Sequence, residues 1–538
     1  MNRILTLILA LLSLAALAPA QQPIPTDDPL LNALRAELKR SQQLQLAGQQ
    51  KPYFVQYIVN DADNFGYDSS LGAPLNKLRS RQRFITVIVR VGDYANDSDL
   101  GFGMGEYDIL AIDDDETALR RTLWLATDRA YKNALQMLSA KESMAKEFES
   151  TDDVPSLSKE TPVQYFEPRI AIPADTERLE RALDAATALY RTDPELQVLA
   201  GSVRLSVNNY YLVNTEGTVM RLAQVGDSVI VHAETQAPDG MRLRRTYSLE
   251  TRSPEALPNA DKLKAEAGKL IATLKALRAA PPVASEYRGP VLFSNDAAAS
   301  VVEGLIAKNL IATRPPPGKT GRVVGPYGES FRARILPDSV TIVDDPTIET
   351  YAGQPLVGFT KYDDEGVKAR PVTLVDKGIL QAYLTSRRPV KDFLASNGHA
   401  RNLGPSVNPA PMNFILSSSK AEAPAALKQK LVAMCKERGL EYCYYVETMG
   451  GLETPRLLYR VYAKDGREEL VRGGVLDELD TRTLRNDIVG VGNDPLVTNN
   501  PANLPASYVA PSLLFGELVV KSSTEAKEKL PQYPAPAL

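Results

Sequence analysis

The chain has 538 residues, of which 44% are hydrophobic and 24% are charged, and its formal net charge is -4. This composition is typical of a globular protein with room for two or three domains. A slightly acidic chain offers no basic field to a polyanion, so we set nucleic acid aside as a partner.

The first 20 residues have the pattern of a signal peptide. Arg3 precedes an apolar run over residues 4–17, and the A-P-A sequence at 18–20 is a small-residue cleavage site. The run is short for a bilayer span and no basic stop-transfer cluster follows it, so we favour this interpretation over a membrane anchor. We therefore expect an exported protein, periplasmic or secreted, that begins at Gln21 and has no membrane contact once the signal is removed.

Helix and strand patterns alternate in the N-terminal region, residues 21–159, which we expect to be α+β. A stripe of leucines predicts an amphipathic helix over residues 28–47. Runs rich in β-branched and aromatic residues predict strands over residues 52–60 and 81–94.

A long helix is predicted after Asp113 and Glu116, which have the spacing of a capping box. The lone tryptophan of the chain, Trp124, falls within this helix, and we expect it in the core. Charged residues and helix breakers dominate residues 141–159, so a linker or domain boundary is expected there.

The central region, residues 160–285, is predicted to be α+β and to contain two β-hairpins. Asn214 and Gly217 lie in a turn between two alternating runs, and both residue types tolerate the positive φ that such turns require. We single them out as structural or peptide-binding residues. A second hairpin turns at residues 238–240, and His232 on its first strand is interpreted as an ordinary strand residue.

Residues 288–310, RGPVLFSNDAAASVVEGLIAKNL, predict a buried strand, a break and a helix. Ser294, Asn295 and Asp296 are side chains of the kind that cap a helix N-terminus. Apolar residues then recur three and four positions apart, which predicts a core helix packed on a sheet.

This stretch resembles the start of the C-terminal domain of the TldD/PmbA family, which is named for metallopeptidases. In the zinc-bearing branch the helix carries HExxxH, whereas this chain has Glu303, Gly304 and Lys308 at those positions. A lysine ammonium has no lone pair for a metal and repels a cation. The cysteine that serves as a third ligand in that branch is also missing from residues 493–507. The resemblance therefore implies the zinc-free, PmbA-like branch, with no catalytic or metal-binding residue and no cofactor.

The C-terminal region, residues 286–521, is predicted to be a large antiparallel β-rich domain of TldD/PmbA type. Residues 314–330 hold three consecutive prolines and four glycines, so we expect an exposed, flexible loop there. Asp364 and Gly366 belong to a hairpin turn, for which we expect a structural or peptide-binding role. The polar, proline-rich residues 522–538 are expected to form a flexible tail.

Four other patterns were weighed as chemical sites. Cys435 and Cys443 leave open either one disulfide or two buried thiols. His399 has no second ligand at metal spacing and is interpreted as a solvated loop residue. Asp344 with Asp345, and Asp363 with its two acidic neighbours, are interpreted as solvated hairpin turns.

A rival hypothesis is a serine hydrolase of penicillin-binding type, because three short motifs occur in the right order. They are Ser143 with Lys146, then Ser206, Val207 and Asn208, then Lys319, Thr320 and Gly321. The sequence context argues against it, because the last motif follows a triple proline instead of lying on a strand.

The resemblance implies a family member that acts in proteolysis or peptide processing. Because HExxxH is absent, we expect a metal-free subunit that binds peptide or unfolded polypeptide. In the family, zinc-free chains pair with zinc-bearing ones to enclose a peptidase chamber, so a TldD-like partner or a homo-oligomer is expected. The alternative is an independent binding protein of the cell envelope without a peptidase role.

Overall fold

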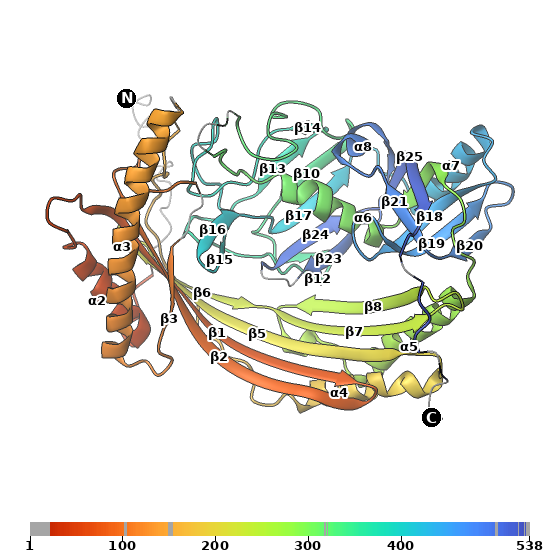
Figure 1. The fold of residues 1–538 in the computed structure, drawn as a ribbon, viewed down its shortest axis with the longest axis horizontal. Helices are drawn as coiled ribbons and strands as arrows, with labels where there is room; N and C mark the ends of the chain where they lie inside the picture. The colour runs from red at the N-terminus through yellow and green to blue at the C-terminus, as the bar shows by residue number, and fades with distance from the viewer. Residues whose placement is uncertain are drawn as a thin grey trace, which may run out of the picture.

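The computed structural model describes residues 22–101, 105–148, 154–316, 319, 321–500, 504–525, 527–531 and 533, so the expected signal peptide lies outside it. A long, curved and mostly antiparallel sheet forms one layer, and a second β-rich body lies on its concave side (Figure 1). The chain passes from an N-terminal α+β part to a large C-terminal part rich in antiparallel strands. The predicted fold class is therefore confirmed.

The curved sheet has the strand order β3-β2-β1-β5-β6-β4, and β7 and β8 continue it from the first half of β5. Its strands are β1 (Pro52–Ser70), β2 (Ala73–Val91), β3 (Glu106–Ile109), β4 (Gln164–Phe166), β5 (Val198–Asn214), β6 (Val219–Val225), β7 (Asp227–Gln236) and β8 (Arg242–Thr251). Because β5 is 17 residues long, it pairs with β7 through its first half and with β6 through its second.

Helices cover the outer face of this sheet at both ends (Figure 1). At one end lie α2 (Pro29–Ser41) and α3 (Glu116–Glu147), and at the other lie α4 (Glu177–Thr187) and α5 (Ala260–Ala279). Short 3₁₀ turns follow α4 at Ala188–Thr192 and precede α5 at Pro254–Ala256. The predicted helices are therefore present, although α2 ends at Ser41 instead of reaching residue 47.

A separate apolar cluster joins the sheet to the C-terminal body. Phe54, Ile58 and Tyr210 from the sheet pack with Tyr362 and Val407 from the body. The two layers thus share a buried interface, and side chains near it are shielded from solvent by segments that are distant in sequence.

The C-terminal body consists of two larger sheets around the predicted core helix, α6 (Asn295–Val301). The six-stranded sheet contains β10 (Val340–Asp344), β13 (Val372–Asp376), β14 (Ile379–Leu380), β17 (Asn413–Ser418), β23 (Leu496–Asn500) and β24 (Ala506–Ala510). The seven-stranded sheet contains β9 (Tyr287–Phe293), β18 (Tyr442–Met449), β19 (Pro455–Tyr462), β20 (Glu468–Val471), β21 (Gly474–Asp477), β22 (Ile488–Val491) and β25 (Leu513–Ser522).

Two small hairpins and two helices complete this body. They are β11 (Thr350–Tyr351) with β12 (Gln354–Pro355), β15 (Ala400–Leu403) with β16 (Ser406–Pro409), α7 (Pro424–Glu437) and α8 (Thr481–Asn486). Both cysteines are buried and unbonded, Cys435 on α7 and Cys443 on β18, which matches the thiol alternative.

Two local predictions about α3 were wrong. Its N-cap is Asp115, whose carboxylate accepts a hydrogen bond from Ala118 N, and Asp113 instead accepts one from Asp115 N. Trp124 is 44% exposed and lies beneath the guanidinium of Arg40, because the apolar stripe of α3 faces the sheet on its other side. Among the described residues, no helix has both the length and the apolar character needed to cross a membrane.

Candidate functional site

The helix that would carry the metal motif changes its pitch at the motif itself. Ser294 caps α6, and its hydroxyl accepts a hydrogen bond from Ala297 N, as predicted. A π-helical turn, η3, then spans Val302–Ile306, and a 3₁₀ turn, η4, spans Ala307–Asn309. We predicted one continuous helix, so this division of the helix corrects the prediction.

The π-helical turn brings together two positions that an ordinary helix would separate. Residues five apart in an α-helix point about 140° away from each other, whereas π-helical hydrogen bonds join residues i and i+5. Glu303 and Lys308 are five apart, and Lys308 Nζ lies 3.0 Å from Glu303 Oε1. The backbone therefore pairs the two positions that HExxxH requires, but an ion pair occupies them.

The side chains at this position do not fit a zinc ion. Glu303 is the one metal-ligating residue among the three motif positions, and its Oε1 also accepts a hydrogen bond from Asn500 Nδ2 at 3.1 Å. Lys308 contributes a positive charge instead of a lone pair. Gly304 packs against Leu452 and offers no side chain. Within the described part of the chain, no three His, Cys, Asp or Glu side chains are grouped so that they could hold a metal.

The structure brings together the two turns that we singled out. Gly217 has a φ of +107° and Gly366 a φ of +79°, so both glycines adopt the left-handed conformation that was predicted for Gly217. Asn214 closes the first turn, because its side-chain oxygen accepts hydrogen bonds from Glu216 N and Thr218 N at 3.1 Å each. A Cβ on Gly366 would lie 2.9 Å from the Thr218 methyl group, so the second turn packs directly on the first.

A buried arginine joins these turns across the interface. The Arg387 guanidinium makes two hydrogen bonds to the Glu216 carboxylate, at 2.6 and 2.8 Å, and donates two more to Ser158 O. Its backbone N–H donates to Glu365 Oε2 at 2.6 Å. The contacts of this region are therefore internal to the protein, and they support a structural role for Asn214, Gly217 and Gly366.

The acidic turn itself is buried, which corrects the prediction of a solvated turn. Asp363 is fully buried and its carboxylate accepts hydrogen bonds from three backbone N–H groups, those of Glu365, Val367 and Ala400. Burial, together with the charge of Glu365, raises the pKa of Asp363 well above its usual value. Burial also raises the pKa of Asp364. The carboxylates of this turn stabilise its loop through these hydrogen bonds. Only the carboxylate of Asp364 is open to a ligand.

His399 and Asp344 are buried as well, so the predictions of a solvated loop histidine and of a solvated turn at Asp344 were both wrong. His399 Nε2 lies 3.4 Å from Asp344 Oδ1, and neither side chain has solvent contact. The Asp344 carboxylate also accepts hydrogen bonds from Met412 N and Asn413 N, each at 2.9 Å. His232 lies on β7, as predicted.

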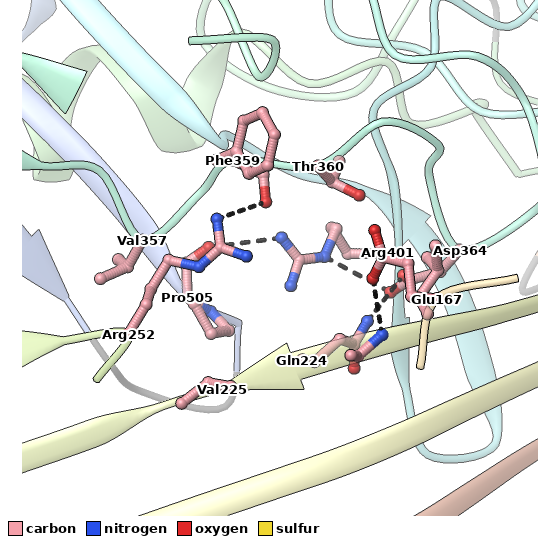
Figure 2. Close-up of a pocket in the computed structure, with 12 residues that line it drawn as sticks. Glu167, Gln224, Val225, Arg252, Val357, Phe359, Thr360, Asp364, Arg401 and Pro505 are labelled. Carbon is pink, nitrogen blue, oxygen red and sulfur yellow. Dashed lines mark hydrogen bonds and ion pairs between the residues drawn. The ribbon is translucent and has the colours of Figure 1, made fainter. Parts of the chain in front are cut away.

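The remaining face of Asp364 opens into a cavity between the sheet and the C-terminal body (Figure 2). Strand β6 forms one wall with residues 222–225, and residues 357–360 form the opposite wall. The guanidinium groups of Arg252 and Arg401 both extend into this cavity (Figure 2). Sequence reasoning missed both arginines, because neither lies in a motif and they are 149 positions apart.

The loop of residues 314–330 agrees with its prediction only in part. The described residues of the 314–330 loop form no regular element, as predicted, but Val323 and Tyr327 are buried in the main core. Pro317, Gly318 and Thr320 lie outside the described residues.

The serines of the rival hydrolase motifs make ordinary structural contacts. Ser143 donates to Ser139 O within α3 and Ser206 donates to Asn64 across β1 and β5, so these contacts do not support a serine-hydrolase site.

Comparison with known proteins finds a family model and relatives that each match part of the chain. Residues 286–522 match the sequence model of the PmbA/TldA metallopeptidase C-terminal domain. A metalloprotease from Methanothermobacter thermautotrophicus is 26% identical over 279 residues, which cover 50% of this chain and 56% of that protein. A metalloprotease from Archaeoglobus fulgidus is 39% identical over 71 residues, 13% of this chain and 15% of that protein. The alignments thus span about half of the first relative and a smaller part of the second.

A solved structure extends the likeness to almost the whole chain. TldE from Thermococcus kodakarensis superimposes with a TM-score of 0.59 at 13% sequence identity, covering 92% of this chain and 100% of that one. At this level of identity the likeness establishes the fold, including the curved sheet that precedes residue 286.

Proposed function

Because this chain belongs to the TldD/PmbA family, we propose that it acts in peptide breakdown or processing as a metal-free subunit that binds peptide or unfolded polypeptide. The observation that carries this proposal is the ion pair of Glu303 and Lys308. The helix keeps the pairing geometry of a metallopeptidase motif, while its side chains have lost the chemistry to hold zinc.

A peptidase role then requires a second chain that supplies the metal. We propose a zinc-bearing, TldD-like partner, because family membership places this fold among metallopeptidases and this chain lacks their ligands. Export to the periplasm or the medium is part of the proposal. It rests on the basic start, the apolar run and the A-P-A sequence of residues 1–20.

An independent envelope binding protein is the second candidate. The buried contacts around Arg387 and the cavity at Arg252 would serve either function equally well. The two candidates differ in what accompanies the chain in the cell, since only the subunit proposal requires a zinc-bearing relative.

The test is affinity purification of the tagged chain from its own cells, followed by mass spectrometry, zinc analysis and peptidase assay. The proposal predicts that a relative with an intact HExxxH motif accompanies it, and that the complex holds zinc and hydrolyses peptides. A chain that purifies alone, as a stable and inactive species, would favour the independent binding protein.

A further inference from the structure

Arg252 is half-buried and has few protein partners for a guanidinium. It follows directly after β8, and its Nη1 donates one hydrogen bond, 3.3 Å long, to Phe359 O. Its positive charge also lies 5.0 Å from the centre of the Phe359 ring. Among the described residues, no carboxylate lies within ion-pair distance of it. Most of its five N–H donors are therefore left for another acceptor.

Arg401 faces the same cavity and brings a second guanidinium (Figure 2). Its Nε lies 3.3 Å from Asp364 Oδ2, and its Nη1 donates to Pro505 O at 3.3 Å. Its Nη2 has no hydrogen-bond partner within the part of the chain that the structure describes. Burial lowers the pKa of Arg252, the more distant charges of Glu167 and Glu349 act in the opposite direction, and the charge of Arg401 adds to the lowering. Two like charges thus share a cavity.

The carboxylates in the cavity wall are already engaged by other groups. Glu167 Oε2 accepts from Ala223 N at 2.8 Å, and Glu167 Oε1 accepts from Tyr165 at 3.0 Å. Asp364 accepts from Asn402 N at 2.7 Å and from Gln224 Nε2 at 3.2 Å. Within the described part of the chain neither carboxylate forms an ion pair with Arg252, although the charge of Glu167 acts on it at longer range. An incoming anion would therefore be its first hydrogen-bonded counter-charge.

We infer that this cavity binds a carboxylate between Arg252 and Arg401. Arginine presents parallel N–H donors that match the two oxygens of a carboxylate. The cavity has a volume of about 40 Å³ in which the centre of a water molecule can lie. A single water needs roughly 10–15 Å³ of such volume. This is room for about three non-hydrogen atoms, the size of a carboxylate. Two carboxylates in the wall disfavour a dianion such as phosphate.

The position of the cavity indicates which carboxylate it would take. Neighbouring residues of β23 link the two regions, because Asn500 donates to Glu303 and Asn499 donates to Glu250 O, which precedes the cavity residue Arg252 by two positions. A short peptide with its C-terminal carboxylate in the cavity would thus lie close to the motif helix. This inference rests on the proposed function, and an acidic peptide side chain is the other source of the same group.

The experiment is calorimetric titration of the mature chain with three probes. These are N-acetyl-tetra-alanine with a free C-terminal carboxylate, its C-terminal amide, and the same amide with one internal glutamate. We expect the free acid to bind at least tenfold more tightly than the plain amide. Equal affinity for the acid and the glutamate-containing amide would support the site and assign it to acidic side chains.

Substitutions of Arg252 test whether the preference for the free carboxylate arises in this cavity. Arg252→Gln should remove the preference for the carboxylate, and Arg252→Lys, which keeps the charge but not the fork, should weaken it severalfold. Arg242→Gln is the matched control, because Arg242 lies on the adjoining strand with a side chain that is 75% exposed. Thermal melting shows whether each variant is folded. If Arg252→Gln does not fold, the carboxylate preference measured for Arg252→Lys tests the site instead.

Equal affinity of the wild-type chain for all three probes would overturn the carboxylate site and leave peptide binding, and hence the proposed function, intact. A preference that survives in Arg252→Gln would overturn it as well. Failure to bind any probe would also count against the site, whereas the subunit proposal would still be decided by its zinc-bearing partner.

Discussion

Gly366 shows how one missing side chain keeps the two layers in contact. Its φ of +79° disfavours any L-residue, and the Thr218 methyl group would lie 2.9 Å from an added Cβ. We predict that Gly366→Ala lowers the free energy of unfolding by about 2–3 kcal/mol. Gly466 has a similar φ of +75° with open space around it, so Gly466→Ala should cost about 1 kcal/mol through backbone strain alone.

Chemical denaturation measures both variants, and a third one separates the two causes. Thr218→Ser removes the methyl group but keeps the hydroxyl that accepts a hydrogen bond from Val163 N. In that background Gly366→Ala should cost no more than Gly466→Ala. If the cost stayed as high as in the wild-type background, contact with Thr218 would not be its origin.

Lys308 should contribute little to stability, although it holds a motif position. Its side chain is 61% exposed, and an exposed ion pair is weak because solvent screens it. We expect Lys308→Ala to change the free energy of unfolding by less than about 0.5 kcal/mol. A loss above roughly 1 kcal/mol in urea denaturation would mean that the ion pair of Lys308 with Glu303 stabilises the end of this helix.

Glu250 gives a pH-dependent prediction. Burial raises the pKa of Glu250 to about 7, and it forms no ion pair among the described residues. The folded state therefore keeps the Glu250 proton to higher pH than the unfolded state. The contribution of Glu250 to stability is fully present below about pH 4.5 and is lost as the pH rises through about 7. We predict that Glu250→Gln raises the free energy of unfolding by on the order of 2 kcal/mol at pH 8 and changes it little at pH 4.

Denaturation at both pH values tests this, with the exposed Glu441→Gln as a control that should change neither value. A gain of equal size at pH 4 and pH 8 would show that the effect has no connection with the ionisation of Glu250.

At the scale of elements, sequence patterns predicted the helix that carries Glu303 and Lys308 least well. The helix start at Ser294 and the buried face were predictable, because caps and apolar periodicity are local signals. The π-helical turn was not, because an inserted residue leaves the apolar pattern almost unchanged over so few positions. The replacement of the ligands was visible in the sequence, but the contact between Glu303 and Lys308 required the structure.

This geometry predicts what it takes to build a zinc site here. Changing Glu303→His, Gly304→Glu and Lys308→His together supplies two ligands, so we expect weak zinc binding and no peptidase activity. Adding Asn500→Cys should tighten zinc binding at least tenfold, because the Asn500 side chain already reaches the Glu303 carboxylate.

Competition with a zinc-sensitive dye measures both variants. Chelator-sensitive peptide hydrolysis by the triple variant would show that the site is poised for zinc, and that the metal-free interpretation is mistaken. Equal zinc affinity of the triple and quadruple variants would mean that Asn500 does not lie at a ligand position.

At the scale of the whole molecule, local patterns predicted elements well and burial poorly. The turn expected at residues 238–240 separates β7 from β8. Asp363 and His399 look like solvated loop residues in the sequence, yet both are buried, Asp363 against Ala400 and His399 against Asp344. Such contacts join segments far apart in the chain, which periodicity cannot detect. The domain boundaries after residues 159 and 285 stay predictions.

The measurement that tests the account most directly is the zinc content of the purified mature chain, with peptidase activity measured with and without a chelator. The account predicts no stoichiometric zinc and no chelator-sensitive hydrolysis by the chain alone, because Glu303 and Lys308 form an ion pair where ligands would be needed. About one tightly bound zinc ion per chain, with activity that a chelator abolishes, would contradict it.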